Sequence, residues 1–145
     1  MTRINLGIEP IELCDQHLKA EWRELPRVRH SFNANVHKRA PAKFKLGTGH
    51  VLFCAARPLL CCERHKNLYA ELLRRNFNPN QQLLLKFTAS YHSLPFTNDD
   101  YKHARLIMQE RLLHKFEIGK PANPTWTNIK QVPSWIPNHL QGVLS

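Results

Sequence analysis

The chain has 145 residues, 42% of them hydrophobic, and its 21 Lys and Arg against 11 Asp and Glu give a formal net charge of +10. This length suits one domain, residues 1–145, with a modest core, and the apolar content argues against a disordered chain. A surplus of positive charge repels itself in the folded state, so it favours an anionic partner such as nucleic acid or an acidic membrane surface. A basic surface that only keeps the protein soluble is the alternative.

Composition also excludes several classes of protein. The longest apolar runs, such as residues 51–56, are far shorter than the roughly 20 residues that span a bilayer. Residues 1–5 show neither the apolar segment nor the cleavage site of a signal peptide, so we expect no secretory signal. Four cysteines occur without a C-x-x-C pair, so we expect reduced thiols in a cytoplasmic protein and neither a metal site nor a cofactor. The cysteines are Cys14, Cys54, Cys61 and Cys62.

A first helix is predicted from Pro10 to Leu25. Its apolar residues recur every three or four positions, which is the spacing of one helical face. Pro10 suits a first helical turn, where a missing N–H costs nothing, and Pro26 is expected to end the helix because the residue before a proline disfavours the α conformation. The expected buried face consists of Ile11, Cys14, Leu18, Trp22 and Leu25.

A basic stretch follows from Arg27 to Lys45, and it contains no acidic residue. We interpret it as a loop that contacts phosphates, since a solvated loop alone does not explain the lack of carboxylates. Residues 46–51 are predicted to form a turn that leads into a buried segment. They are not a phosphate-binding P-loop, because the G-K-[ST] ending is missing.

A second helix is predicted over roughly residues 57–77, and it ends at Asn78-Pro79-Asn80. After it, residues 83–85 fit either a short helix or a buried strand. The side chains expected on the buried side of the second helix are those of Leu59, Cys62, Tyr69, Leu72, Leu73 and Phe77.

A third helix is predicted from about Thr97 to Phe116, because cap residues and acidic first-turn residues occur together at its start. Beyond Gly119, four prolines prevent another long helix. The sequence therefore predicts an all-α fold, a single domain of three main helices with irregular loops and a C-terminal tail. The side chains expected inside are Ala104, Met108 and either Ile107 or Leu112 of the helix, and Trp126, Trp135 and Ile136 of the tail.

The first predicted helix also carries a chemical pattern. His17, Glu21 and Glu24 are spaced by four and three residues, so they share one face. Arg23 and Arg27 flank Glu24, and their charges favour its ionised form. The structural alternative is a salt-bridged surface helix, which is common and contributes little stability.

The start of the chain offers a nucleophile. Removal of Met1 would expose the α-amine of Thr2, whose pKa of about 7.7–8.0 lies well below that of a lysine. The neighbouring Arg3 would lower that pKa further. Such an amine can attack a carbonyl-like carbon and form a Schiff base, although many proteins begin with Met-Thr and make no use of it.

The third predicted helix carries a cationic face near its C-terminal end, formed by Arg111 and Lys115 with His114 beside them. Cations at this position are favourable against the helix dipole. The same cations can also bind phosphates, and composition permits both interpretations.

Several segments together resemble one protein family, the pyrimidine-dimer DNA glycosylase/AP lyases of T-even bacteriophage. The most specific is the block from Asp15 to Val28, DQHLKAEWRELPRV, preceded by TRINL at residues 2–6. LGTGHV at residues 46–51 is similar to the family's LGAGHV, and residues 72–78 and 109–115 resemble its CLKRGFN and third-helix segments. PTW at residues 124–126 resembles the start of its tail, so the similarity extends over the whole predicted domain.

The resemblance implies an all-α enzyme that acts on double-stranded DNA containing a lesion. Family members excise the 5′ base of a cyclobutane pyrimidine dimer and then cleave the backbone by β-elimination. Their nucleophile is an N-terminal threonine amine, which matches Thr2, and their essential glutamate matches Glu24. We expect a monomer, in the host cell cytoplasm if the protein is viral. The residues that match the family's DNA contacts are Arg3, Gln16, His17, Arg23, Arg27, Arg111 and Lys115.

The chain departs from the family at several places. One extra residue lies within residues 7–10, residues 78–102 show little similarity, and the aromatic tail WYKYYG is replaced by WTNIK at residues 126–130. Because that tail lies near the lesion in the family, the lesion itself is open. The alternatives are a glycosylase with the same chemistry on another damaged or modified base, and a non-catalytic basic DNA-binding protein.

Overall fold

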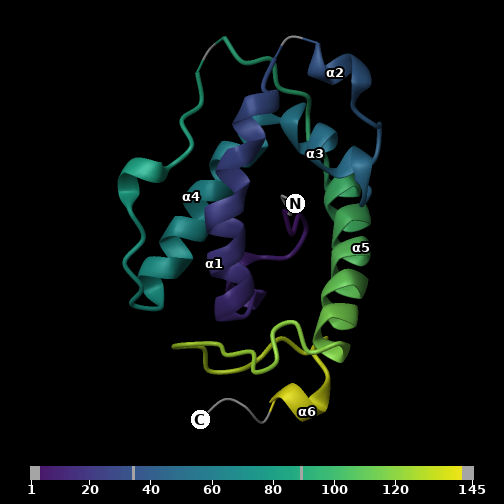
Figure 1. Ribbon diagram of the computed structural model, residues 1–145. Helices are drawn as coiled ribbons and strands as arrows, with labels where there is room; N and C mark the ends of the chain where they lie inside the picture. Colours follow the sequence, from purple (N-terminus) through teal and green to yellow (C-terminus); the bar gives the residue numbers. More distant parts are fainter. Residues whose placement is uncertain (1–3, 34, 89, 142–145) are drawn as a thin grey trace.

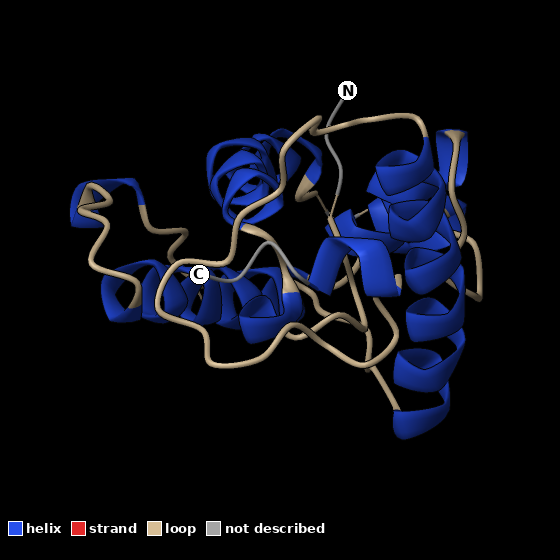
Figure 2. Cartoon of the chain, turned by 90° about the horizontal axis from the view of Figure 1, so that it is seen from below, coloured by secondary structure: helices blue, strands red, loops and turns tan. Residues whose placement is uncertain are grey.

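The computed structural model describes residues 4–33, 35–88 and 90–141, and all regular structure in these ranges is helical (Figure 1, Figure 2). The predicted all-α fold is confirmed, and no described helix is long and apolar enough to cross a membrane. In chain order the elements are η1 (Pro10–Glu12), α1 (Asp15–Glu24), η2 (Leu25–Ser31), α2 (Val36–Arg39), α3 (Thr48–Ala55), α4 (Pro58–Arg74), η3 (Gln81–Leu83), α5 (Asn98–Glu117) and α6 (Asn138–Gln141), where η denotes a 3₁₀ helix.

Helices α1 and α4 lie side by side, and α5 faces them from across the molecule (Figure 1). The segment that precedes η1 passes between α1 and α5, while α3 lies at one end of the molecule and the tail after α5 at the other (Figure 1). The core fills the space between these elements, and its fully buried side chains come from all of them. They include Ile4, Ile8, Leu13, Leu18, Leu25, Phe53, Leu68, Leu72 and Met108.

The predicted first helix is not continuous. The chain forms the short helix η1, extends at Leu13 and Cys14, and begins α1 at Asp15. It then continues past Pro26 as η2, because a proline near the start of a 3₁₀ helix gives up no hydrogen bond. Ile11 therefore leaves the predicted stripe and is 51% exposed, whereas the other four residues of the stripe are buried.

Helix α4 covers most of the predicted second helix, and of the side chains expected inside, Cys62 and Leu72 are buried while Tyr69 and Phe77 pack against the core. Leu59 and Leu73, expected inside, are exposed. The buried side instead holds Arg64, His65 and Glu71 beside its apolar residues. Polar side chains occupy the interior because the neighbouring elements supply their partners: His65, for example, bonds the carbonyl of Trp22 and the N–H of Leu85.

The predicted third helix is confirmed as α5. Thr97 accepts a hydrogen bond from the N–H of Asp100 at 3.1 Å and the Asp100 carboxylate accepts one from the N–H of Thr97 at 2.9 Å, which is a capping box. Its buried residues are Ala104, Met108, Leu112 and Phe116. A fourth helix, α3, replaces the turn predicted near residues 46–51, and the four cysteines are buried free thiols.

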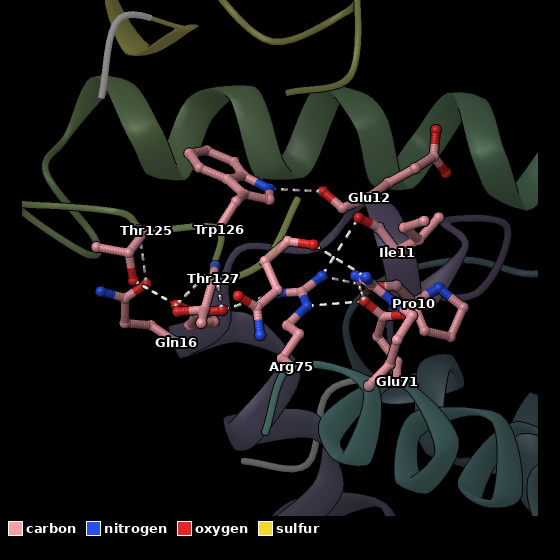
Figure 3. Close-up of polar contacts among 12 residues, drawn as sticks. Pro10, Ile11, Glu12, Gln16, Glu71, Arg75, Thr125, Trp126 and Thr127 are labelled. Atoms are coloured by element: carbon pink, nitrogen blue, oxygen red, sulfur yellow. Dashed lines mark hydrogen bonds and ion pairs between the residues drawn. The ribbon is translucent and has the colours of Figure 1, made fainter. Parts of the chain in front are cut away.

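Arg75 joins α4 to the start of α1 and is almost completely buried (Figure 3). Its guanidinium donates to Glu71 at 2.8 Å, to Asp15 at 2.9 Å and to the carbonyls of Pro10 and Ile11. Asp15 also accepts hydrogen bonds from the tail, namely from the hydroxyls of Thr125 and Thr127 at 2.6 Å each. One buried cation therefore fixes the first turn of α1 against both α4 and the tail.

Replacing Arg75 by methionine should destabilise the protein by about 3–5 kcal/mol, because it leaves the buried Asp15 carboxylate without its arginine partner. Arg74→Met is the matched control. Arg74 bonds the same Glu71 carboxylate from an exposed position, with 42% of its side chain accessible, so its loss should cost less than about 1 kcal/mol. Chemical denaturation gives both free energies of unfolding, and equal costs would contradict the role assigned to Arg75.

Candidate active site

A cavity of about 330 Å³ opens between α1, α5 and the N-terminal segment. One face of α1 supplies its acidic side, and α5 supplies Leu112 and Lys115. The prediction that His17, Glu21 and Glu24 share one face of α1 is confirmed, since all three line this cavity. The full lining is Asn5, His17, Ala20, Glu21, Glu24, Leu112 and Lys115.

Glu21 forms the buried floor of the cavity, with 1% of the residue exposed. Arg64 of α4 donates to its carboxylate through Nε at 2.7 Å and through Nη2 at 3.0 Å. Burial opposes the charge on Arg64, but the Glu21 carboxylate outweighs this and raises the pKa of the guanidinium. Glu21 is therefore a buried, paired carboxylate rather than part of a salt-bridged surface.

The same carboxylate holds the N-terminal segment in place. The backbone N–H and the side-chain amide of Asn5 donate to Glu21 at 3.1 and 2.7 Å. One residue earlier, the N–H of Ile4 donates to Nε2 of His50 at 2.9 Å, and Arg64 reaches the carbonyl of Ile8 at 2.6 Å. These bonds fix the chain where it enters the cavity, although Thr2 and Arg3 themselves lie outside the described residues.

Glu24 and Lys115 place opposite charges in the same cavity. Glu24 lies in the last turn of α1 and is half-buried. Burial, together with the nearby charges of Arg111 and Lys120, lowers the pKa of the Lys115 ammonium, while Glu24 acts in the opposite direction. The cavity thus brings a carboxylate close to a cation whose charge is destabilised.

His17 presents a nitrogen lone pair in the buried part of the site. Its Nε2 lies 3.1 Å from the carbonyl oxygen of Lys120, and because a carbonyl only accepts, Nε2 carries the proton. Burial lowers the pKa of His17, and the hydrogen bond to Lys120, which acts to raise it, does not offset this. Its Nδ1 is buried and has no partner among the described residues, so His17 is a neutral base with a free acceptor atom.

The other predicted DNA-binding residues that the structure describes, Gln16, Arg23, Arg27 and Arg111, do not line the cavity. Arg23 and Arg27 are exposed, and neither makes an ion pair within the described ranges. Arg111 is half-buried on α5, one turn before Lys115. Gln16 bonds the tail, donating to the carbonyl of Asn123 at 2.9 Å and accepting from the N–H of Thr125 at 3.1 Å.

Sequence reasoning missed three residues that shape the site: Asn5, His50 and Arg64. Asn5 and Arg64 carry no local signal, because their partners lie 16 and 43 residues away. His50 lies in the TGHV segment of α3, where only a family resemblance drew attention to it. In the described part of the chain, no group of three or more His, Cys, Asp and Glu side chains could hold a metal ion.

His17 and His50 should adopt opposite tautomers, which nitrogen-resolved NMR can distinguish. His17 should carry its proton on Nε2, because it donates to a carbonyl, and His50 should carry it on Nδ1, because Nε2 accepts from Ile4. Both should titrate below the ordinary histidine pKa of about 6.5. Matching tautomers, or a pKa for His17 above the ordinary value, would contradict this description of the cavity.

One comparison with known proteins bears on this site. A protein-family model described as pyrimidine dimer DNA glycosylase matches residues 1–85 of the chain. The matched part contains the N-terminal residues, the whole of α1 with Glu24, and α4 with Arg64. Helix α5, which supplies Lys115, lies beyond the match.

Proposed function

The chain belongs to the pyrimidine dimer DNA glycosylase family and is a DNA repair glycosylase, and we propose that it also cleaves the strand at the abasic site that it creates. The single observation that carries this proposal is the cavity that Glu24, His17 and Lys115 line together with Asn5. Duplex DNA with a cyclobutane pyrimidine dimer is the proposed substrate, and no cofactor is needed for the steps below.

The proposed nucleophile is the α-amine of Thr2 after removal of Met1. Thr2 lies three residues before Asn5, a cavity-lining residue whose backbone is bonded to Glu21. A chain spans at most about 3.3–3.6 Å per residue, so the amine lies within roughly 11 Å of Asn5 and can reach the cavity. Its low pKa supplies an unprotonated amine at neutral pH, which a lysine with an ordinary pKa does not.

The first chemical step exchanges one bond at C1′ of the sugar for another. The amine nitrogen bonds to C1′ as the glycosylic bond breaks, and the departing base takes the bonding electron pair and a proton. The sugar ring then opens as O4′ leaves C1′ with a proton from the nitrogen, which gives an imine. Glu24 is the proposed stabiliser of the positive charge that develops at C1′ and on the imine; its half-buried position in the lining of the cavity supports this role.

The second step breaks the DNA backbone. A base removes a proton from C2′, the electrons form a double bond to C3′, and the 3′ phosphate leaves with the bonding pair. Water then hydrolyses the imine and restores the amine. The Glu24 carboxylate, which lines the cavity, is the group proposed to take the C2′ proton, and Lys115 supplies a positive charge near the strand.

Borohydride should trap the protein covalently on a duplex with one abasic site, because it reduces an imine to a stable amine. The trapped complex should form only with protein from which Met1 has been removed, as verified by mass spectrometry. The same chain with Met1 retained is the matched control, since its Thr2 nitrogen is an amide. A Met1-free preparation that leaves no adduct would contradict the lyase proposal.

Glu24→Gln should slow nicking of a duplex with one thymine dimer by about 100-fold or more, because it removes the charge that stabilises the developing cation. Binding to the same duplex should change little. Glu110→Gln on α5 is the control, since Glu110 is exposed and does not line the cavity.

The same assay tests the proposed lesion. A duplex with a modified cytosine in place of the dimer should remain uncut by the unaltered protein. Faster cutting of the cytosine duplex would assign the chemistry to another damaged base, and equal nicking by Glu24→Gln would remove Glu24 from the mechanism.

A further inference from the structure

The turn that begins α3 brings a buried histidine to the start of the chain. Gly47, the residue before α3, has a φ of 82°, a backbone conformation that residues with a Cβ rarely adopt. The N–H of His50 donates to the carbonyl of Gly47 at 3.1 Å. This turn places His50 near the start of the helix, where only 4% of the residue is exposed.

The surroundings of His50 hold its ring in place and keep it neutral. The ring of Phe44 meets it edge-on, with centroids 5.2 Å apart, and Phe44 in turn packs against Phe53. Burial lowers the pKa of His50, and this outweighs the charge of Glu21 and the backbone of Lys45, which both act to raise it. The ring is therefore an uncharged hydrogen-bond acceptor at neutral pH.

The partner of this ring is the backbone near the start of the chain. The N–H of Ile4 donates to Nε2 of His50 at 2.9 Å, across 46 residues of sequence. The side chain of Ile4 is buried in the core, which holds its Cα. The hydrogen bond adds control of rotation, because a planar peptide unit turns as one body with its N–H. Only two residues, at most about 7 Å of chain, separate this anchored unit from the α-amine of Thr2.

A second anchor comes from a different helix and binds the next residue. The N–H of Asn5 donates to the Glu21 carboxylate of α1 at 3.1 Å, whereas the N–H of Ile4 is bound by α3. Two successive N–H groups are thus held from two helices. This arrangement restricts the rotation of the segment about its own axis as well as its position.

We propose that His50 is a positioning residue for the N-terminal amine, and that its Nε2 directs the first residues of the chain into the cavity by holding the Ile4 N–H. This rests on the proposed function, because it takes the amine of Thr2 as the nucleophile. His50 does not line the cavity, so it acts through the backbone and not by contact with DNA. Because a misplacement of about 1 Å can slow a reaction about 100-fold, one anchored N–H can control the rate.

The alternative is a structural role alone, since a buried N–H without an acceptor destabilises a folded protein. The two roles affect different measurements. A structural role changes the fraction of protein that is folded. A positioning role changes the rate of imine formation in protein that is folded and bound to DNA.

His50→Phe keeps a ring of similar size but removes the acceptor, whereas His50→Gln keeps an acceptor oxygen. With Met1-free protein in excess over a duplex with one abasic site, His50→Phe should be trapped by borohydride about tenfold or more slowly than the original protein. His50→Gln should keep most of the original rate. The affinity of each variant for a duplex with a tetrahydrofuran abasic analogue, which cannot form an imine, should be unchanged.

His65→Phe is the matched control. His65 is also a buried histidine, but its ring bonds the backbone of Trp22 and Leu85 instead of the N-terminal segment. Its replacement should lower the stability of the protein and leave the trapping rate of the folded protein unchanged. An equal loss of rate in His65→Phe and His50→Phe would reduce His50 to a structural role.

The pH dependence of trapping gives a readout that does not need His50→Phe to fold. Acid adds a proton to Nε2 of His50 and removes its lone pair, whereas His50→Gln has no such group. The rate of His50→Gln divided by that of the original protein should therefore rise as the pH falls below about 6.5, since the pKa of His50 lies below that ordinary value. Groups common to both proteins, such as the amine and His17, cancel in this ratio. A ratio that stays constant would contradict the proposal.

Hydrogen exchange of the Ile4 amide shows directly whether the anchor is lost. The amide should be protected in the original protein and in His50→Gln, and should exchange faster in His50→Phe. Faster exchange together with an unchanged trapping rate would overturn the positioning role of His50. Failure of the proposed function is separately visible, because the Met1-free original protein would then form no trapped complex at all.

Discussion

Two buried ion pairs hold α1 against α4, and the site depends on them. Arg75 binds Asp15 in the first turn of α1, and Arg64 binds Glu21 near its end. Together they set the position and the rotation of the helix that presents Glu24. Replacing one partner of such a pair is costly, because it leaves a buried charge uncompensated. The helix face is therefore specified more strictly than apolar packing alone would require.

The chain has a net charge of +10, and several of its few carboxylates are bound to arginines and so do not neutralise the other cations. Glu12, Asp15, Glu21 and Glu71 are bound by arginines inside the molecule or at its edge. Within the described ranges, none of the Lys and Arg side chains from the end of α1 to the start of α3 makes an ion pair. The charged residues are therefore divided between two places: paired arginines and carboxylates fix the fold inside, and unpaired cations lie at the surface.

Periodicity predicted those parts of the structure that depend on local spacing. The shared face of His17, Glu21 and Glu24 follows from helix geometry, and the capping signal placed the start of α5 within one residue. It could not predict that Arg64 and Arg75 are buried, because arginine is usually exposed unless a distant partner neutralises it. For the same reason it missed the polar residues on the buried face of α4 and wrongly placed Leu59 and Leu73 there. The family resemblance, rather than periodicity, gave roles to Thr2 and Glu24, and these roles remain proposals.

The proposed nucleophile is the N-terminal amine rather than any lysine. Lys115 is the strongest alternative, because its pKa is lowered and its side chain lines the cavity. Peptide mapping of the borohydride-reduced complex by mass spectrometry distinguishes them directly. The account predicts the sugar remnant on the α-amine of Thr2. A remnant on Lys115 or on another lysine would contradict it.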